Sequence, residues 1–191
     1  MKVLAIVGSP RVEGNTEALA RHTLDVMADA GLETELVRLA GLDIAPCDAC
    51  QACSSGEGCV IEDDLQPLYA KMKESQGIIL ASPVYFGSAT ALIKAVMERA
   101  GYIALRSGNA LAGKVGSPLV VARRAGHNFT YTQMVQWFII LGMVVPGASY
   151  WPIAFGRAKG EVESDTEGME TARSLGRNMA DLVKRLGKEA R

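Results

Sequence analysis

The sequence has no cysteine outside residues 47–59 and only two histidines, His22 and His127. It has no apolar run long enough for a membrane span: the apolar start ends at Gly8, and no small-residue cleavage site follows. The net charge is −1, so no basic excess favours nucleic acid or an anionic membrane. We therefore expect a globular protein in the cytoplasm, with neither nucleic acid nor a membrane as a partner.

Apolar strands alternate with helical segments along the chain. Strands are predicted at 2–7, 32–39, 77–82, 114–122 and 143–145, and helices at about 15–29, 63–74, 90–105, 130–141 and 166–186. In residues 151–165 the apolar residues follow neither a helix period nor a strand period. This alternation predicts an α/β fold, a parallel sheet with helices on both faces. Five strands favour the flavodoxin-like order 2-1-3-4-5, and 191 residues suit a single domain, 1–191.

In such a sheet, ligands bind beyond the carboxyl ends of strands 1 and 3, where the winding direction reverses. This rule selects the loop Gly8–Thr16 (GSPRVEGNT) and the loop Ser82–Thr90 (SPVYFGSAT), with Ala122–His127 (ARRAGH) beside them. The first loop matches neither the dinucleotide nor the nucleoside-triphosphate fingerprint. It has the parts of a phosphate site, although a plain strand-to-helix turn is the alternative. These parts are two hydroxyls, a guanidinium, an amide and a glycine before a helix N-terminus: Ser9, Thr16, Arg11, Asn15 and Gly14.

The second loop combines backbone amides with aromatic surface at Pro83, Tyr85, Phe86 and Gly87. That combination suits a flat ring with hydrogen-bonding edges, such as an isoalloxazine. The alternative for Tyr85 and Phe86 is a place at the rim of the site or in a subunit contact. In the third loop, one of the two adjacent arginines, 123 or 124, would place positive charge beside such a ring.

The cysteines follow the spacing C-x2-C-x2-C-x5-C, at Cys47, Cys50, Cys53 and Cys59, in a loop inserted after strand 2 (residues 43–62). Disulfides are disfavoured because no secretory signal is present. Zinc sites usually have two separated pairs of ligands. The bunched CxxCxxC favours a [4Fe–4S] cluster, and the Ser- and Gly-rich segment is flexible enough to bring the fourth cysteine back. Zinc and free or redox-active thiols remain alternatives.

Three segments, SPRxxGNT, SPVYFGS and RAGH, resemble the NADPH-dependent FMN reductase branch of the flavodoxin-like proteins, over nearly the whole chain. The four-cysteine motif is similar to that of the iron–sulfur flavoproteins in this branch. The resemblance implies FMN, one [4Fe–4S] cluster on the four cysteines, and a homodimer or homotetramer. The residues implied at FMN are Ser9, Arg11, Gly14, Asn15, Thr16, Pro83, Val84, Tyr85, Phe86, Gly87, Arg124 and Gly126.

The resemblance also predicts an oxidoreductase. Electrons would pass from a one-electron donor such as ferredoxin, through the [4Fe–4S] cluster, to FMN and on to an acceptor. One alternative is an NAD(P)H-dependent FMN or quinone reductase without a functional cluster, and another is a redox sensor. No catalytic side chain is identified: His22 lies inside a predicted helix, and His127 has no nucleophile as a partner.

Overall fold

The computed structural model describes residues 1–56 and 58–189. Residue 57 of the predicted loop 43–62 and residues 190–191 of the predicted domain lie outside this range. The elements in chain order are β1 (Lys2–Val7), α1 (Asn15–Asp29), β2 (Glu33–Arg38), η1 (Ala52–Ser55), α2 (Leu65–Glu74), β3 (Gly77–Pro83), α3 (Ala91–Arg106), β4 (Val115–Ala122), α4 (His127–Ile140), β5 (Ile153–Phe155), η2 (Glu161–Ser164) and α5 (Thr166–Glu189).

The five strands form one parallel sheet in the order β2-β1-β3-β4-β5, which confirms the predicted flavodoxin-like topology. Almost every residue of β1, β3 and β4 is buried, because helices cover both faces of these central strands. The strand β2 is only half-buried, because it lies at the edge of the sheet.

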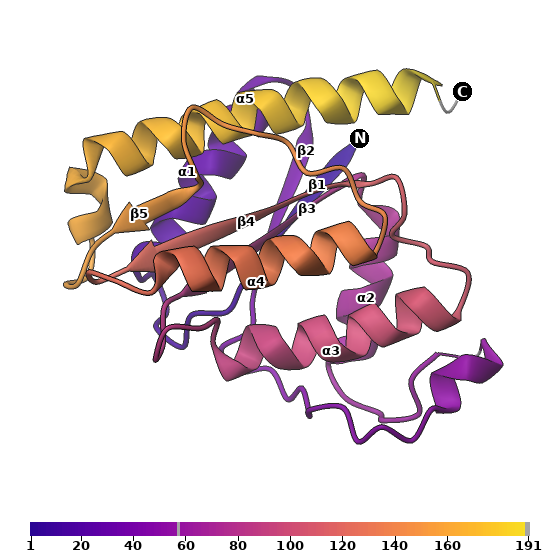
Figure 1. Ribbon diagram of the computed structural model, residues 1–191. Helices are drawn as coiled ribbons and strands as arrows, with labels where there is room; N and C mark the ends of the chain where they lie inside the picture. The colour runs from indigo at the N-terminus through magenta and orange to yellow at the C-terminus, as the bar shows by residue number, and fades with distance from the viewer. Residues whose placement is uncertain (57, 190–191) are drawn as a thin grey trace.

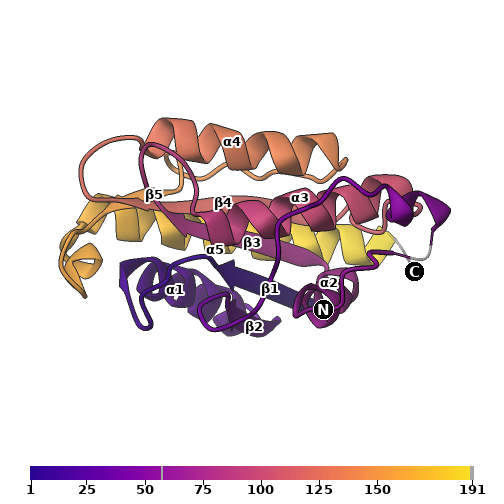
Figure 2. The same cartoon turned by 90° about the horizontal axis from the view of Figure 1, so that it is seen from below.

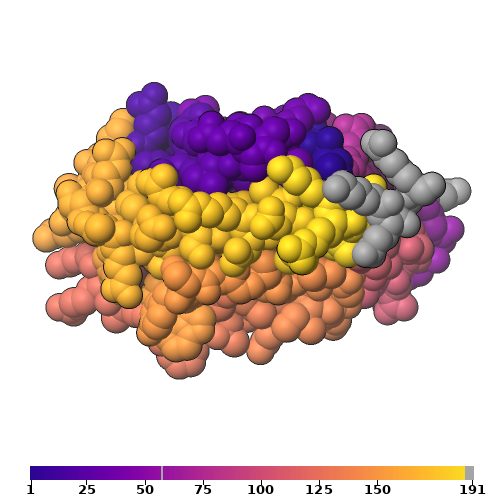
Figure 3. Space-filling model, turned by 90° about the horizontal axis from the view of Figure 1, so that it is seen from above, coloured from indigo at the N-terminus to yellow at the C-terminus, as the bar shows by residue number. Residues whose placement is uncertain are grey.

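Two helical layers enclose the sheet (Figure 1). One face is covered by α1 and α5, and the other by α2, α3 and α4; Figure 2 shows α1 and α4 on opposite sides. Each layer has its own apolar core, including Leu19 and Leu175 on one side and Ile93 and Phe138 on the other. In Figure 3, α5 runs along the outside as a yellow band. None of the described helices has the length and apolar character needed to cross a bilayer.

The fifth strand was predicted at 143–145, and this prediction is wrong. Val144 forms only an isolated parallel bridge to Val115, at the amino end of β4. The strand β5 pairs instead with Val120–Ala122 at the carboxyl end of β4, inside the segment that shows no period. Pro146 lies two residues after Val144. It has no N–H to donate, so it interrupts further pairing there.

Candidate functional site

A cavity of about 250 Å³ lies at the carboxyl ends of the central strands, where the winding rule places it. Its lining residues are Ser9, Arg11, Gly14, Asn15, Thr16, Pro83, Val84, Tyr85, Val121, Arg123, Gly156, Arg157 and Lys159. The four polar residues and the glycine predicted for a phosphate are therefore brought together. Ser9, only 5% exposed, shapes the first loop because its Oγ accepts a hydrogen bond from the N–H of Arg11 (3.1 Å).

The helix α1 begins at this cavity without a side-chain cap. Its N-cap is Gly14 in an extended conformation, and within residues 1–56 and 58–189 no side-chain cap hydrogen bond is formed there. The free N–H groups and the positive end of the helix dipole are thus available to an anion. A Cβ on Gly14 would lie 3.1 Å from Cβ of Arg11, so a side chain at this position would crowd the loop.

A segment that the sequence prediction missed, residues 156–161, closes one side of the cavity. Nδ2 of Asn15 donates a 2.7 Å hydrogen bond to the carbonyl of Ala158, and Nη1 of Arg11 donates to the carbonyl of Arg157 (3.3 Å). Lys159 pairs with Glu13 at 3.1 Å. The sequence of this segment shows neither a helix nor a strand period. The feature that could have indicated its place at the cavity is its pair of cations, Arg157 and Lys159.

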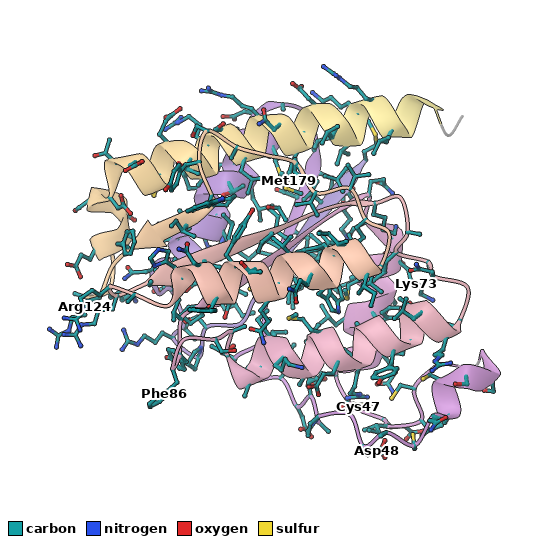
Figure 4. All side chains as sticks on the ribbon, in the orientation of Figure 1. Cys47, Asp48, Lys73, Phe86, Arg124 and Met179 are labelled. Carbon is teal, nitrogen blue, oxygen red and sulfur yellow. The ribbon has the colours of Figure 1, made fainter. Side chains whose placement is uncertain are left out.

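The second loop forms a tight turn in which the backbones of Tyr85 and Ser88 bond to each other in both directions (2.9 and 3.1 Å). Phe86 and Gly87 occupy its centre with φ of 50° and 77°, the conformation of a type I′ turn. Phe86 therefore carries backbone strain that glycine would not. Its ring is fully exposed at the tip, as Figure 4 shows.

Four of the predicted flavin-binding residues do not line this cavity: Phe86, Gly87, Arg124 and Gly126. Gly126 instead packs against the second loop, since a Cβ there would lie 2.9 Å from Cα of Gly87. The side chain of Arg124 is exposed and points away from the molecule (Figure 4). Its neighbour Arg123 lines the cavity.

Behind the first loop, the buried carboxylate of Glu17 fixes the start of α1. It accepts hydrogen bonds from Nε and Nη2 of Arg38 (both 2.7 Å) and from the backbone N–H of Glu13 (2.9 Å). Glu13 needs this support because its φ is 52°. The hydrogen bonds from Arg38 lower the pKa of Glu17 to about 2, against the opposing effect of burial.

The cysteine loop forms a second cavity, of about 160 Å³, on the outer side of α3 (Figure 4). All four cysteines line it, together with Arg99, Tyr102, Ile103 and Arg106 of α3. All four are free thiols. Among residues 1–56 and 58–189, no three side chains of Cys, His, Asp or Glu are already arranged around a single metal position.

Left-handed backbone conformations coil this loop. Ala49 and Gln51, on either side of Cys50, have φ of 60° and 62°, and Gly56 and Gly58 have φ of 87° and 96°. Alanine and glutamine rarely adopt such values, which cluster at functional sites. The repeated reversals keep a short segment turned back on itself, so that its thiols face one cavity.

Arg99 belongs to α3, and its side chain, only 1% exposed, contacts the cysteine loop. It donates to the carbonyls of Ala45 (3.2 Å) and Ile61 (3.1 Å), to Sγ of Cys59 (3.3 Å) and to the carboxylate of Asp63. Burial opposes ionisation of Asp63, but Arg99 and two backbone N–H groups hold its pKa below the ordinary value. The sequence prediction missed Arg99, since nothing local distinguishes it from a surface arginine.

The two cavities lie toward opposite ends of α3. Thr90, the N-cap of α3, donates a hydrogen bond to Gly8 of the first loop, beside the first cavity, whereas Arg99, Ile103 and Arg106 line the cysteine cavity. At 1.5 Å per residue, Thr90 and Arg99 are separated by roughly 14 Å along the helix axis. No residue lines both cavities among those the structure describes.

Known proteins are similar to this chain over most of its length. The family model described as NADPH-dependent FMN reductase matches residues 1–158. An iron–sulfur flavoprotein of Methanocaldococcus jannaschii is 42% identical, over 98% of this chain and 100% of its own. Another, from Methanosarcina thermophila, is 37% identical over 98% of each chain.

Solved structures share the fold at low sequence identity. RosB with a bound 8-demethyl-8-formylriboflavin-5′-phosphate intermediate has a TM-score of 0.77 at 21% identity, covering 98% of this chain and 81% of RosB. A flavodoxin from the domain Archaea has a TM-score of 0.64 at 14% identity, covering 96% and 99% of the two chains.

Proposed function

This chain belongs to the NADPH-dependent FMN reductase family and is a flavoprotein oxidoreductase, and we propose that it binds FMN and one [4Fe–4S] cluster and passes electrons between a one-electron donor and a two-electron acceptor. A ferredoxin is the donor class that we expect. When bound, the cluster supplies one-electron transfer and FMN supplies both one- and two-electron chemistry.

The observation that carries the proposal is the convergence of all four cysteines on one cavity. Four thiols in a coiled loop are a donor set for a [4Fe–4S] cluster, and no histidine lines the cavity to complete a mixed zinc site. The buried Nε of Arg99 has no hydrogen-bond partner within the described residues, so it leaves a donor for a group in the cavity. The names of the two curated relatives also favour the cluster.

The residues of the other cavity fit FMN. Ser9, Asn15, Thr16 and the free N–H groups of α1 would hold the phosphate dianion, and Arg11 would balance its charge. Pro83, Val84 and Tyr85 would lie against the ring. For the cation beside the ring, the cavity favours Arg123 over Arg124. The tight turn at 85–88 would keep water from one side of the ring.

A homodimer or homotetramer is part of the proposal. The helix α4 has large apolar residues on more than one side: Trp137 and Phe138 are buried, but Phe129, Ile139 and Ile140 are exposed. Phe86 adds a fully exposed aromatic ring. Another copy of the chain would cover these surfaces. Because the two cavities of one chain lie apart, the neighbouring copy would also bring its own FMN cavity toward the cysteine cavity of the first chain. A cytoplasmic location remains our prediction.

The first experiment measures iron, acid-labile sulfide, zinc and flavin in anaerobically purified protein. We expect about four iron, four sulfide and one FMN per chain. Cys50→Ala should lose the iron and sulfide while it keeps FMN, because Cys50 does not line the flavin cavity. The matched control is Ser54→Ala, which alters the same cavity but removes no thiol. FMN without iron, even after reconstitution, would contradict the cluster.

A second measurement separates the donors. Stopped-flow reduction under anaerobic conditions compares reduced ferredoxin with NADPH as the reductant. Faster reduction by ferredoxin, lost in Cys50→Ala, supports the proposal. Rapid hydride transfer from NADPH that Cys50→Ala does not change would instead support the simple reductase, which the family's description keeps open.

A further inference from the structure

We propose that Arg99 is a positioning residue that closes the cysteine loop and donates a hydrogen bond to the Cys59 thiolate, thereby raising the reduction potential of the cluster. This inference rests on the proposed [4Fe–4S] site. It adds a function for a buried side chain that does not touch the flavin cavity and that lies more than thirty residues from the cysteine motif in sequence.

The contacts of Arg99 fasten both ends of the loop to one group. On the amino-terminal side, Nη1 donates to the carbonyl of Ala45, which precedes Cys47 by two residues. On the carboxyl-terminal side, Nη2 donates to the carbonyl of Ile61 and to Sγ of Cys59. The fifteen or so residues between them are thereby closed into a ring, which reduces the conformational freedom that assembly of the site must overcome.

Cys59 is the cysteine that most needs such an anchor. Cys47, Cys50 and Cys53 are spaced closely enough to stay together, but five residues, two of them left-handed glycines, separate Cys59 from Cys53. The bond from Arg99 Nη2 to its sulfur, 3.3 Å long, is a direct constraint on its position. The five-residue spacing therefore allows Cys59 to reach the other cysteines, and the buried guanidinium fixes the position of its sulfur.

Arginine suits this position for a geometric reason. Its planar fork donates to several acceptors in fixed directions, whereas a lysine ammonium offers one point of charge. The carboxylate of Asp63 pairs with Nη1 and also accepts from the N–H groups of Ala45 and Leu65, so it holds the guanidinium in one orientation. The side chain of Asp63 is itself only 5% exposed.

The direction of the effect on the potential follows from charge. Reduction adds an electron to the cluster, and part of this charge falls on the cysteine sulfurs. A hydrogen bond to sulfur and a buried cation both stabilise the reduced form more than the oxidised form. Removing them should make the potential more negative.

The test uses the full-length protein with Arg99→Gln and Arg99→Lys. The matched control is Arg106→Gln, which removes an arginine of the same helix and the same cavity that is exposed and makes no hydrogen bond within the described residues. Midpoint potentials come from titrations of the reconstituted proteins monitored by electron paramagnetic resonance. Amide hydrogen exchange over residues 45–61 is measured on the same chains before reconstitution.

We expect Arg99→Gln to shift the reduction equilibrium at least tenfold toward the oxidised form, about 59 mV, and Arg106→Gln to shift it much less. We also expect exchange over 45–61 to rise at least tenfold in both Arg99 variants before iron is added. Arg99→Lys should shift the midpoint potential less than Arg99→Gln does, because the positive charge stays. Its amide hydrogen exchange over 45–61 should still be faster than in the wild type. If Arg99→Gln does not fold, Arg99→Lys carries the test.

An unchanged potential in Arg99→Gln, or equal shifts in Arg99→Gln and Arg106→Gln, would overturn the role toward sulfur. Unchanged exchange over 45–61 in both Arg99 variants would overturn the closing of the loop. A wild-type protein that takes up no iron would instead contradict the proposed function, and the exchange measurement would then still decide whether Arg99 orders the loop.

Discussion

Oγ1 of Thr90 donates a 2.7 Å hydrogen bond to the carbonyl oxygen of Gly8, and both groups are buried. Oγ1 of Thr90 also accepts a hydrogen bond from the N–H of Ile93 and so caps α3. One hydroxyl thus joins the end of β1, where the first loop (Gly8–Thr16, the proposed phosphate loop) starts, to the beginning of α3. This contact holds together the two loops that line the cavity proposed for FMN, called the flavin cavity.

Replacing Thr90 with valine keeps the shape of the side chain but removes the hydroxyl. The carbonyl of Gly8 would be left buried without its partner, which costs about 1–3 kcal/mol of unfolding free energy. We also expect weaker FMN binding, because the phosphate loop loses its link to the second loop. Urea denaturation and fluorescence titration of FMN measure the two effects. Thr90→Ser keeps the hydroxyl and should behave like the wild type, and an equal loss in both variants would refute this explanation.

Gly156→Ala should loosen FMN binding. An added Cβ would lie 2.7 Å from Nδ2 of Asn15 and 2.7 Å from the N–H of Val162, so the segment 156–161 must move away from the phosphate loop. The FMN dissociation constant, measured by flavin fluorescence, should rise several-fold. The control is Gly147→Ala, where the new methyl group meets nothing within 4 Å. A dissociation constant that is the same in both variants would rule out a role for the segment.

Glu17→Gln should remove a pH-dependent part of the stability. The pKa of Glu17 falls from an ordinary 4.5 to about 2, which corresponds to roughly 3 kcal/mol. Because the folded-state pKa is depressed, this contribution is fully present above about pH 5 and is lost as the pH falls toward 2. Unfolding free energies at pH 7, 4 and 2.5 should show the wild type and the variant converging in acid. Asp25→Asn, an exposed change on the same helix, should show no such convergence.

Phe86→Asn should shift the protein toward smaller assemblies without loss of FMN. Asparagine tolerates a positive φ, so the turn is kept while the exposed ring is removed. Light scattering coupled to size-exclusion chromatography measures the mass. Phe86→Tyr keeps an aromatic ring and should assemble like the wild type. If Phe86→Asn keeps its mass but loses FMN, then Phe86 contacts the flavin instead.

Local patterns predicted most of the fold. Continuous apolar strands and amphipathic helices gave the five-stranded order, since strand burial on both faces leaves few arrangements. The failure at β5 has a physical cause: 143–145 and 153–155 are both short and apolar, and both pair with β4, one at each end. Apolar character alone does not choose between them; Pro146, which has no N–H to donate, stops the pairing after 143–145, whereas 153–155 contains no proline.

The site residues divide in the same way. Ser9, Arg11, Asn15 and Thr16 are recognisable because they follow a strand at the switch point, where topology alone directs them to one cavity. Arg157 and Lys159 are not, because they reach the cavity only through contacts with residues more than 140 positions away. The preference for Arg123 over its neighbour likewise depends on side-chain direction, which spacing does not specify.

The sequence by itself determined that all four cysteines lie in one loop and that the loop follows the second strand, because spacing and order are properties of the chain. Only the tertiary structure decided that α3 lies behind that loop and that Arg99 holds it at Ala45, Cys59 and Ile61. The physical reason is burial: removed from water, a guanidinium must find its acceptors within the protein, and here they come from both ends of the loop.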